Sequence, residues 1–193
     1  MKSVCVFCGA RPGQNPSYMA AAKATGDLLG RRGITMIYGG GSIGLMGATA
    51  DAALDAGGKV IGVIPRSLLQ REMGHGRLTE QHVVGTMHER KALMNKISDG
   101  FIILPGGVGT LEEFFEIWSW GQLGIHAKPF GVLNVDGFWN PMFQLLDQMT
   151  AQGFVKPEHR AMVRVSEDIT ALVDAMNAYH APGDVVWLDA DKI

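Results

Sequence analysis

Short apolar runs alternate with helical patterns along most of the chain, and this alternation limits the fold more than any other feature. Runs of four to six residues are separated, with one exception, by helical patterns of ten residues or more. Strands that are almost continuously apolar are covered on both faces, as in a parallel sheet. Repeated strand–helix–strand units with right-handed crossovers build a doubly wound sheet. We therefore expect an α/β fold, a doubly wound parallel sheet with helices on both faces.

The short connections, the lack of repeats and the lack of a low-complexity linker predict a single domain over residues 1–193. The expected strands are 4–7, 34–38, 59–64, 81–84, 101–104, 130–134 and 162–165. The expected helices are 16–31, 44–56, 87–98, 110–123, 141–152 and 169–178. Residues 65–77 are expected to form a loop at the ligand end of the sheet, as a wall or lid. No element is assigned from Pro182 onward.

Charge and hydropathy exclude several classes of protein. The 193 residues include 17 Lys and Arg against 19 Asp and Glu, a formal net charge of −2. A weakly acidic chain without a cluster of basic residues is atypical of a nucleic-acid-binding protein. No apolar run reaches the ~20 residues of a membrane span, and the apolar start is too short for a signal peptide. We therefore expect a cytoplasmic protein that binds neither nucleic acid nor membrane.

The cysteines and histidines predict neither a metal site nor a redox centre. Cys5 and Cys8 form a C-x-x-C on an expected strand, where side chains three residues apart point to opposite faces. A zinc site would need two more soft ligands, and the six histidines show no metal-ligand spacing. No nucleophile elbow with a Ser-His-Asp order is present. We expect reduced, structural thiols and no metal.

Glycine is the compositional outlier, with 26 residues in the chain, and two clusters of glycines follow expected strands. The first glycine cluster, residues 39–47, satisfies G-x-G-x-x-G, a turn that brings backbone N–H groups and a helix N-terminus toward an anion. The acid that would hold a dinucleotide ribose is missing at the end of the next strand, although Arg66 would suit a 2′-phosphate. Phosphate binding, dinucleotide binding and simple packing of helix against strand all stay open.

The second glycine cluster, residues 105–110, reads Pro-Gly-Gly-Val-Gly-Thr and opens a helix. It is not a Walker loop, because no Lys-Ser or Lys-Thr follows the glycines. Its N–H groups would face outward together with the Thr110 hydroxyl and the Glu113 carboxylate. Thr110-x-x-Glu113 also fits a capping box, in which Glu113 accepts a hydrogen bond from the Thr110 N–H. Glu113 is therefore either part of a helix cap or a catalytic carboxylate.

A third motif begins the helix expected at 87–98, with Thr86-x-x-Glu89 as its capping box. Arg90 shares a helix face with the apolar Met94, so its guanidinium needs a partner. It is either a snorkelling or salt-bridged arginine, or it points into the ligand crevice at a carboxylate or phosphate.

Together these motifs resemble the signature of the Lonely Guy family, the cytokinin riboside 5′-monophosphate phosphoribohydrolases long mislabelled as lysine decarboxylases. The matching segments are GGGS-x-GLMG at 39–47, MH-x-RK at 87–91, PGG-x-GT-x-x-E at 105–113, LGIH-x-KP at 123–129 and LNVDG at 133–137. The resemblance covers residues 3–165.

The resemblance implies a Rossmann-like homodimer that cleaves the N-glycosidic bond of an adenine-type nucleoside 5′-monophosphate, AMP as well as N6-prenylated forms, to free base and ribose 5-phosphate. It implies no cofactor. By position, Arg90 and Glu113 match the catalytic pair. The implied substrate contacts are Glu72, Lys91, Gly107, Val108, Gly109, Thr110, Leu111, Glu112 and Ser119, the last at a position where many relatives have threonine.

The phosphate is expected at the start of the helix after the second glycine cluster. Gly106 and the first-cluster residues Gly40, Gly41 and Ser42 would complete this phosphate loop. Cleavage passes through an oxocarbenium-like transition state, which Glu113 would stabilise while Arg90 keeps that carboxylate ionised and in place. A decarboxylase would need a pyridoxal Schiff-base lysine and a phosphate cup. The alternatives are a nucleotide-binding or sensing protein without turnover and, less well matched, an NADP-dependent reductase.

Overall fold

The computed structural model describes residues 1–69 and 74–181, and the strands in these ranges form one parallel sheet. Its order is β4-β3-β2-β1-β5-β6-β7, and every neighbouring pair is parallel. The expected doubly wound α/β sheet is therefore confirmed. The strands are β1 (Ser3–Phe7), β2 (Thr35–Tyr38), β3 (Val60–Pro65), β4 (Glu80–Val84), β5 (Phe101–Ile103), β6 (Phe130–Leu133) and β7 (Val163–Ser166).

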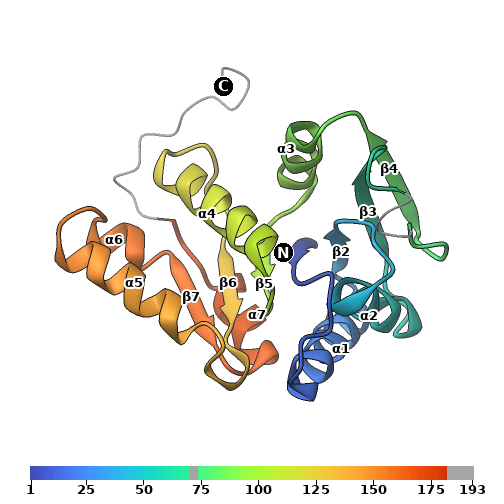
Figure 1. Cartoon of the computed structure of the whole chain (residues 1–193), viewed down its shortest axis with the longest axis horizontal. Coiled ribbons are helices and arrows are strands. Elements are labelled where there is room, and N and C mark those ends of the chain that lie inside the picture. The colour runs from blue at the N-terminus through green and yellow to red at the C-terminus, as the bar shows by residue number, and fades with distance from the viewer. Residues whose placement is uncertain (70–73, 182–193) are drawn as a thin grey trace.

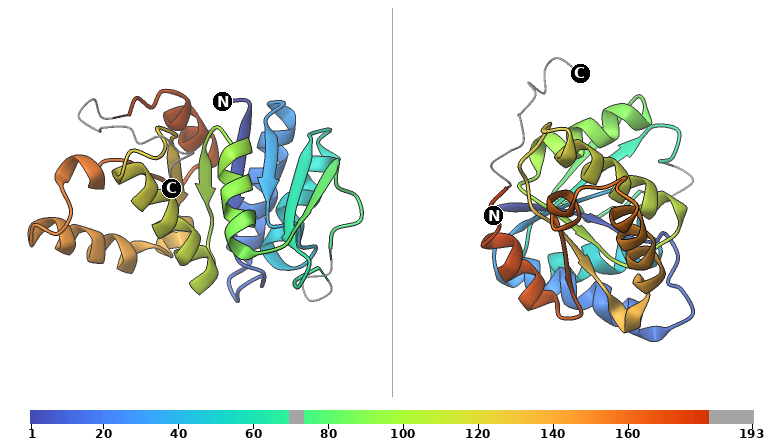
Figure 2. Two further views of the ribbon diagram at one scale, coloured as in Figure 1. Left: turned by 90° about the horizontal axis from the view of Figure 1, so that it is seen from above. Right: turned by 90° about the vertical axis from the view of Figure 1, so that its left-hand side faces the viewer.

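Helices cover both faces of the sheet: α1, α2 and α7 lie on one face and α3, α4 and α5 on the other (Figures 1 and 2). The helices are α1 (Pro16–Arg31), α2 (Gly44–Asp55), α3 (Met87–Ile97), α4 (Val108–Gln122), α5 (Asn140–Ala151), the single turn α6 (Pro157–Arg160) and α7 (Ile169–Asn177), with a 3-10 turn η1 (Val135–Gly137). Among the described residues, none of these helices combines the length and the apolar character that crossing a membrane requires.

The central strand β1 feeds both hydrophobic cores because its side chains alternate between the faces of the sheet. Val4 and Val6 are buried in the core beneath α1, α2 and α7, whereas Cys5 and Phe7 are buried in the core beneath α3, α4 and α5. Cys8, which follows the strand, belongs to the first of these cores. The two thiols are free and lie on opposite faces, as the sequence predicts.

The connections reverse direction between β1 and β5. From β1 the chain crosses to β2, β3 and β4 on one side, and then returns past β1 to place β5, β6 and β7 on the other. At such a switch point two neighbouring loops leave the carboxyl ends of their strands in opposite directions and leave a crevice between them. The order of the strands therefore marks the gap between β1 and β5 as the place for a ligand.

The predicted elements differ from the observed ones mainly at their ends. The helix after the second glycine cluster starts at Val108, two residues before the predicted start. The turns η1 and α6 were not predicted, because three or four residues are too few to show a helical period. The residues from Pro182 onward, to which the sequence assigns no element, lie outside the described residues.

Candidate active site

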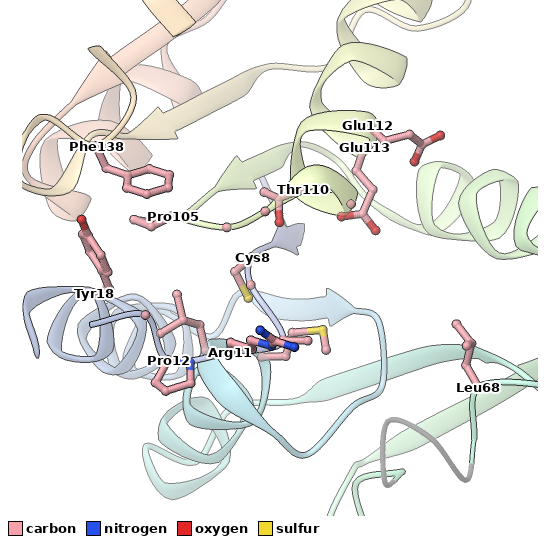
Figure 3. A pocket seen from close by; sticks show the side chains of 18 of the residues that line it. Cys8, Arg11, Pro12, Tyr18, Leu68, Pro105, Thr110, Glu112, Glu113 and Phe138 are labelled. Carbon is pink, nitrogen blue, oxygen red and sulfur yellow. The ribbon is translucent and has the colours of Figure 1, made fainter. Parts of the chain in front are cut away.

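A cavity of about 550 Å³ opens at the switch point, between the carboxyl ends of β1 and β5 (Figure 3). The loop after β1 forms one side of it and the turn from β5 into α4 forms the other. The starts of α2 and α3 add further walls. The lining residues are Cys8, Gly9, Ala10, Arg11, Pro12, Gly13, Tyr18, Leu45, Met46, Leu68, Met87, Arg90, Pro105, Gly106, Gly107, Gly109, Thr110, Glu112, Glu113 and Phe138.

The loop after β1 is fixed against both neighbouring loops by the backbone of Gly9. The Gly9 N–H donates to the Pro105 carbonyl (N···O 3.0 Å), and the Gly9 carbonyl accepts from the N–H of Leu45 at the start of α2 (3.1 Å). A side chain at Gly9 would meet the Gly106 Cα at 3.4 Å. The two loops therefore lie backbone against backbone, which fixes the shape of the cavity between β1 and β5.

The predicted capping box Thr110-x-x-Glu113 is wrong. The N-cap of α4 is Gly107, which has no side chain to accept a hydrogen bond, and Thr110 is the third residue of the helix. Thr110 is buried, and a Cβ on Gly106 would lie 2.1 Å from its hydroxyl oxygen, so Gly106 leaves room for this side chain. The glycine-rich turn can enter the helix early because glycine tolerates the close approach, and Glu113 then falls in the second turn.

Both carboxylates at the start of α4 line the cavity. Figure 3 shows the Glu113 side chain beside Thr110, on the side of the cavity that faces Cys8, whereas Glu112 points away from them. Glu112 forms an ion pair with Lys91 (Oε1···Nζ 2.5 Å). Glu113 is therefore the carboxylate that α4 presents to the middle of the cavity.

Arg90 is 5% exposed although it carries a charge, and it lines the same cavity as Glu113. Its Nη1 contacts the Sδ of Met87 at 3.8 Å, and its buried Nε has no hydrogen-bond partner. The two opposite charges of Arg90 and Glu113 thus face one cavity. A guanidinium held in this way is favourable only if a ligand or solvent group in the cavity completes its shell.

The surroundings of Arg90 come from the two motifs that the sequence singles out. Thr86 caps α3, because its Oγ1 accepts from the Glu89 N–H (3.1 Å), and the Glu89 carboxylate accepts from the N–H of Gly85 (2.8 Å), one residue before the expected donor. A Cβ on Gly39 would lie 2.0 Å from the Arg90 Nη2. The first glycine cluster therefore provides the space that the guanidinium occupies.

The first-cluster residues Gly40, Gly41, Ser42 and Gly44 do not line the cavity, whereas Leu45 and Met46 do. Gly41 forms an isolated bridge with Gly74, and the Gly40 carbonyl accepts from the His75 N–H (3.1 Å), so this segment supports the end of the loop at 65–77. Gly44 is pressed against Ala10, to which a Cβ would come within 2.3 Å. Gly40, Gly41 and Ser42, which the sequence assigns to the phosphate loop, are not among the lining residues, and their contact with phosphate stays a prediction.

The predicted substrate contacts divide into two groups. One group lines the cavity together with Arg90 and Glu113: Gly106, Gly107, Gly109, Thr110 and Glu112. Of the others, Val108 is 83% exposed, Ser119 is exposed, and Leu111 packs against the core beneath α4. Lys91 ties α3 to α4 through ion pairs with Glu112 and Glu116; burial alone would lower the pKa of Lys91, but hydrogen bonds to these carboxylates raise it. Glu72 lies outside the described residues.

Sequence reasoning missed the wall formed by Arg11, Tyr18 and Phe138. The rings of Tyr18 and Phe138 meet edge to face, with centroids 5.3 Å apart. The turn before Phe138 is held by a hydrogen bond from the Asn15 amide to Asp136, a non-glycine residue with φ of 49°. The one signal that pointed here is position: this loop follows the first strand as the glycine clusters follow theirs.

Cys8 lines the cavity as a neutral thiol. Burial raises the pKa of Cys8, and the negative charge of Glu113 raises it further. The pKa of Cys5 is raised by burial first and by Glu113 second, while the charge of Arg90 acts in the opposite direction. Neither thiol is suited to act as a nucleophile, since the thiolate is the reactive form. Among the described residues, no three His, Cys, Asp or Glu side chains gather closely enough to hold a metal ion.

Solved structures with the same fold cover almost the whole chain. The molybdenum cofactor carrier protein of Chlamydomonas matches 92% of this chain and 98% of its own, with a TM-score of 0.68 and 20% identity. The molybdenum cofactor binding protein of Rippkaea orientalis matches 92% and 97%, with a TM-score of 0.70 and 20% identity. At this level of identity the likeness concerns the fold alone.

Closer sequence relatives are named cytokinin riboside 5′-monophosphate phosphoribohydrolases. One from Rhodococcoides fascians is 46% identical over 92% of this chain and 90% of its own length. One from Arabidopsis thaliana is 43% identical over 100% and 91%, and one from Oryza sativa is 45% identical over 97% and 78%. The family model described as "Possible lysine decarboxylase" matches residues 46–176. The chain therefore belongs to the family of the cytokinin riboside 5′-monophosphate phosphoribohydrolases.

Proposed function

We propose that the protein hydrolyses the N-glycosidic bond of cytokinin riboside 5′-monophosphates and of AMP, releasing the free base and ribose 5-phosphate. The observation that carries this proposal is a single cavity that holds Glu113, a buried and incompletely paired Arg90, and the glycine-capped start of α4. Relatives that share 43–46% of their residues with most of this chain are named for the first of these activities.

The cavity suits a nucleoside monophosphate in size and chemistry. Its volume of about 550 Å³ falls within the range of small-molecule sites. The N–H groups at the start of α4 and the positive end of its dipole attract the phosphate. Apolar side chains from Leu45, Met46 and Met87 offer a surface for the flat base. A single nucleotide-binding domain over residues 1–193 then provides the cavity and the groups that the proposed reaction uses.

The reaction breaks the bond between C1′ of the ribose and the base nitrogen and forms a bond between C1′ and a water oxygen. The bonding pair leaves with the base, and positive charge develops on the sugar. Glu113 stabilises this charge and accepts the proton that the water loses, while the departing nitrogen takes up a proton. A negative side chain aimed at the developing charge is the largest single contribution that such a site can make.

Arg90 acts on the same step from the other side of the cavity. Its positive charge favours the ionised form of the Glu113 carboxylate, and its place on the cavity wall lets the guanidinium contact the leaving base. Because the guanidinium is buried, this influence is screened less than on the surface. Replacement of Arg90 by alanine should therefore lower turnover about 100-fold.

The decisive experiment measures free base released from AMP and from N6-prenylated AMP by chromatography. E113Q should lose about 1000-fold or more in turnover and still bind AMP in calorimetry. The control E167Q changes an exposed glutamate that directly follows β7 and does not line the cavity, so it should match the wild type. Near-normal turnover by E113Q would remove the carboxylate from the mechanism. Binding of AMP by the wild type with no base released would leave a nucleotide-binding protein instead.

The proposal includes a homodimer in the cytoplasm. Val108 and Leu123, at the two ends of α4, are 83% and 57% exposed, and a second copy of the chain packed along this helix would bury both. The free thiols Cys5 and Cys8 suit a reducing compartment. Light scattering should give about twice the chain mass of 20.8 kDa, and fractionation of the source cells should recover the protein with the cytoplasm; a monomer would contradict the first part.

A further inference from the structure

Arg11 is the second arginine on the cavity wall, and its charge has no carboxylate partner in the described part of the chain. It is exposed and forms no ion pair there. Three other exposed arginines are paired with carboxylates, Arg31 with Asp27, Arg32 with Asp174 and Arg77 with Asp51 and Asp55, whereas Arg66 and Arg164 form no ion pair among the described residues but do not line the cavity. Because Arg11 faces a cavity instead of a surface carboxylate, a negative group of a ligand is the natural partner for it.

The loop holds Arg11 close to the start of α4. The Gly9 N–H donates to the Pro105 carbonyl, and a Cβ added to Gly9 would lie 3.4 Å from the Gly106 Cα. Arg11 follows two residues later on the same wall. Figure 3 shows Arg11 and Pro12 on the side of the cavity opposite Thr110, with Cys8 between the two sides. An anion at the first turn of α4 therefore lies between this helix and the arginine.

Without Arg11, the cavity wall would carry too little positive charge to balance the substrate phosphate. A phosphate monoester carries nearly two negative charges near neutral pH, and a helix N-terminus supplies only about half a positive charge. Glu113, in the second turn of the same helix, repels the phosphate. Arg90 is buried and lies close enough to Cys5, together with Glu113, for both charges to act on that thiol. Arg11 is the remaining cation on the wall.

We propose that Arg11 binds the 5′-phosphate of the substrate and gives the enzyme its preference for nucleoside monophosphates over nucleosides. The guanidinium fork fits two phosphate oxygens at once, which an ammonium group cannot do. The phosphate then sits between the α4 N-terminus and the loop after β1, instead of between α4 and the first glycine cluster. This inference rests on the proposed function, since it concerns the same cavity.

The test separates phosphate recognition from the chemistry. In an E113Q background, calorimetry with AMP and with adenosine should show that R11A weakens AMP binding about 10-fold to 100-fold and changes adenosine binding less than 2-fold. In the active enzyme, R11A should raise KM for AMP by a similar factor with kcat within about 3-fold. R11K should recover part of the loss because it keeps the charge without the fork. R31A, at a paired surface arginine, is the matched control.

Two outcomes would overturn the inference. AMP affinity in R11A within 2-fold of the parent would show that the arginine does not hold the phosphate. Equal losses for AMP and adenosine would show that Arg11 only shapes the loop. Failure of the proposed function would look different, because the wild type would then release no base from AMP. The affinities of E113Q and of E113Q with R11A for AMP and for adenosine would still decide the role of Arg11.

Discussion

The first glycine cluster (39–47) and the second (105–110) both join a buried strand to a helix, and on sequence both suit a phosphate. In the structure only the second cluster lines the cavity with its glycines, whereas the first contributes Leu45 and Met46. The start of α2 is already used: the Leu45 N–H donates to Gly9, and Gly44 is pressed against Ala10. The start of α4 has a glycine cap and open space around Gly107 and Gly109. Similar local chemistry thus serves packing in one place and lines a cavity in the other.

The difference is caused by position in the sheet. β5 borders the switch point with β1, so its loop faces the crevice, whereas β2 lies one strand further inside one half of the sheet. The loop after β1 then covers the start of α2. The first glycine cluster still matters for the chemistry, because Gly39 leaves the space that holds Arg90.

Gly39→Ala gives the largest expected effect and tests this indirect role. Its Cβ would lie 2.0 Å from the Arg90 Nη2, and the end of that side chain yields more easily than backbone. We expect kcat to fall about 100-fold, as for the alanine replacement of Arg90, which is roughly 3 kcal/mol of barrier, with unfolding free energy within about 1 kcal/mol of the wild type. Initial rates and urea unfolding measure the two effects. Gly76→Ala, in open space, should change neither; an active Gly39→Ala would sever the link to Arg90.

Gly47→Ala should instead affect the fold. The added Cβ would meet the Ser42 carbonyl oxygen at 2.0 Å and its carbon at 2.4 Å, and backbone cannot move away cheaply. We expect a loss of about 3 kcal/mol in unfolding free energy, measured by denaturant titration. The folded fraction should keep nearly normal turnover per molecule. A stable variant with a damaged active site would reverse the roles assigned to the two clusters.

The helix that follows the second glycine cluster, α4, is contacted near its other end by His126, which is buried. Its Nδ1 accepts from the Lys128 N–H, so its Nε2 donates to the Ile117 carbonyl (2.8 Å). Burial lowers the pKa of His126 to about 4, although the hydrogen bond to Ile117 opposes this. Between pH 6.5 and 4 the unfolded chain therefore binds the extra proton, and stability falls as pH falls.

This contribution should amount to about 2 kcal/mol between pH 8 and pH 5. Urea titrations of the wild type and of H126Q across this range measure it, since glutamine can still donate to the Ile117 carbonyl but cannot take up a proton. The pH dependence of H126Q should be shallower by that amount. Parallel profiles for the two proteins would mean that His126 is protonated in the folded state.

Gly109→Ala gives the smallest expected effect and the clearest contrast with Gly47→Ala. Nothing lies within 4 Å of the added Cβ, so the helix should gain about 0.5–1 kcal/mol in stability. The methyl group would enter the cavity where the phosphate is proposed to bind, and kcat/KM for AMP should fall about 10-fold. Thermal unfolding and steady-state kinetics read the two changes. A more stable enzyme with unchanged kcat/KM would place the phosphate elsewhere.

Much of the fold could be predicted because it rests on local patterns. The bounds of α1, Pro16–Arg31, match the prediction, since Asn15 and Pro16 mark its start and the apolar period continues to its end. Arg90 and Glu113 were found from motifs. The start of α4 was misplaced because threonine is a good cap, and nothing local shows that the glycine before the helix takes that place. Arg11, Tyr18 and Phe138 carry no motif and come together only across the sheet.

The sequence itself contains the alternation of apolar strands with helices, the capping residues and the two glycine clusters. These features alone determined the layered parallel sheet and the types of group available for chemistry. Which glycine cluster faces a ligand, and which side chains join it, was decided only when the strands took their order. Neighbours along the chain are set by covalent bonds, whereas the crevice between β1 and β5 exists because two connections leave adjacent strand ends in opposite directions.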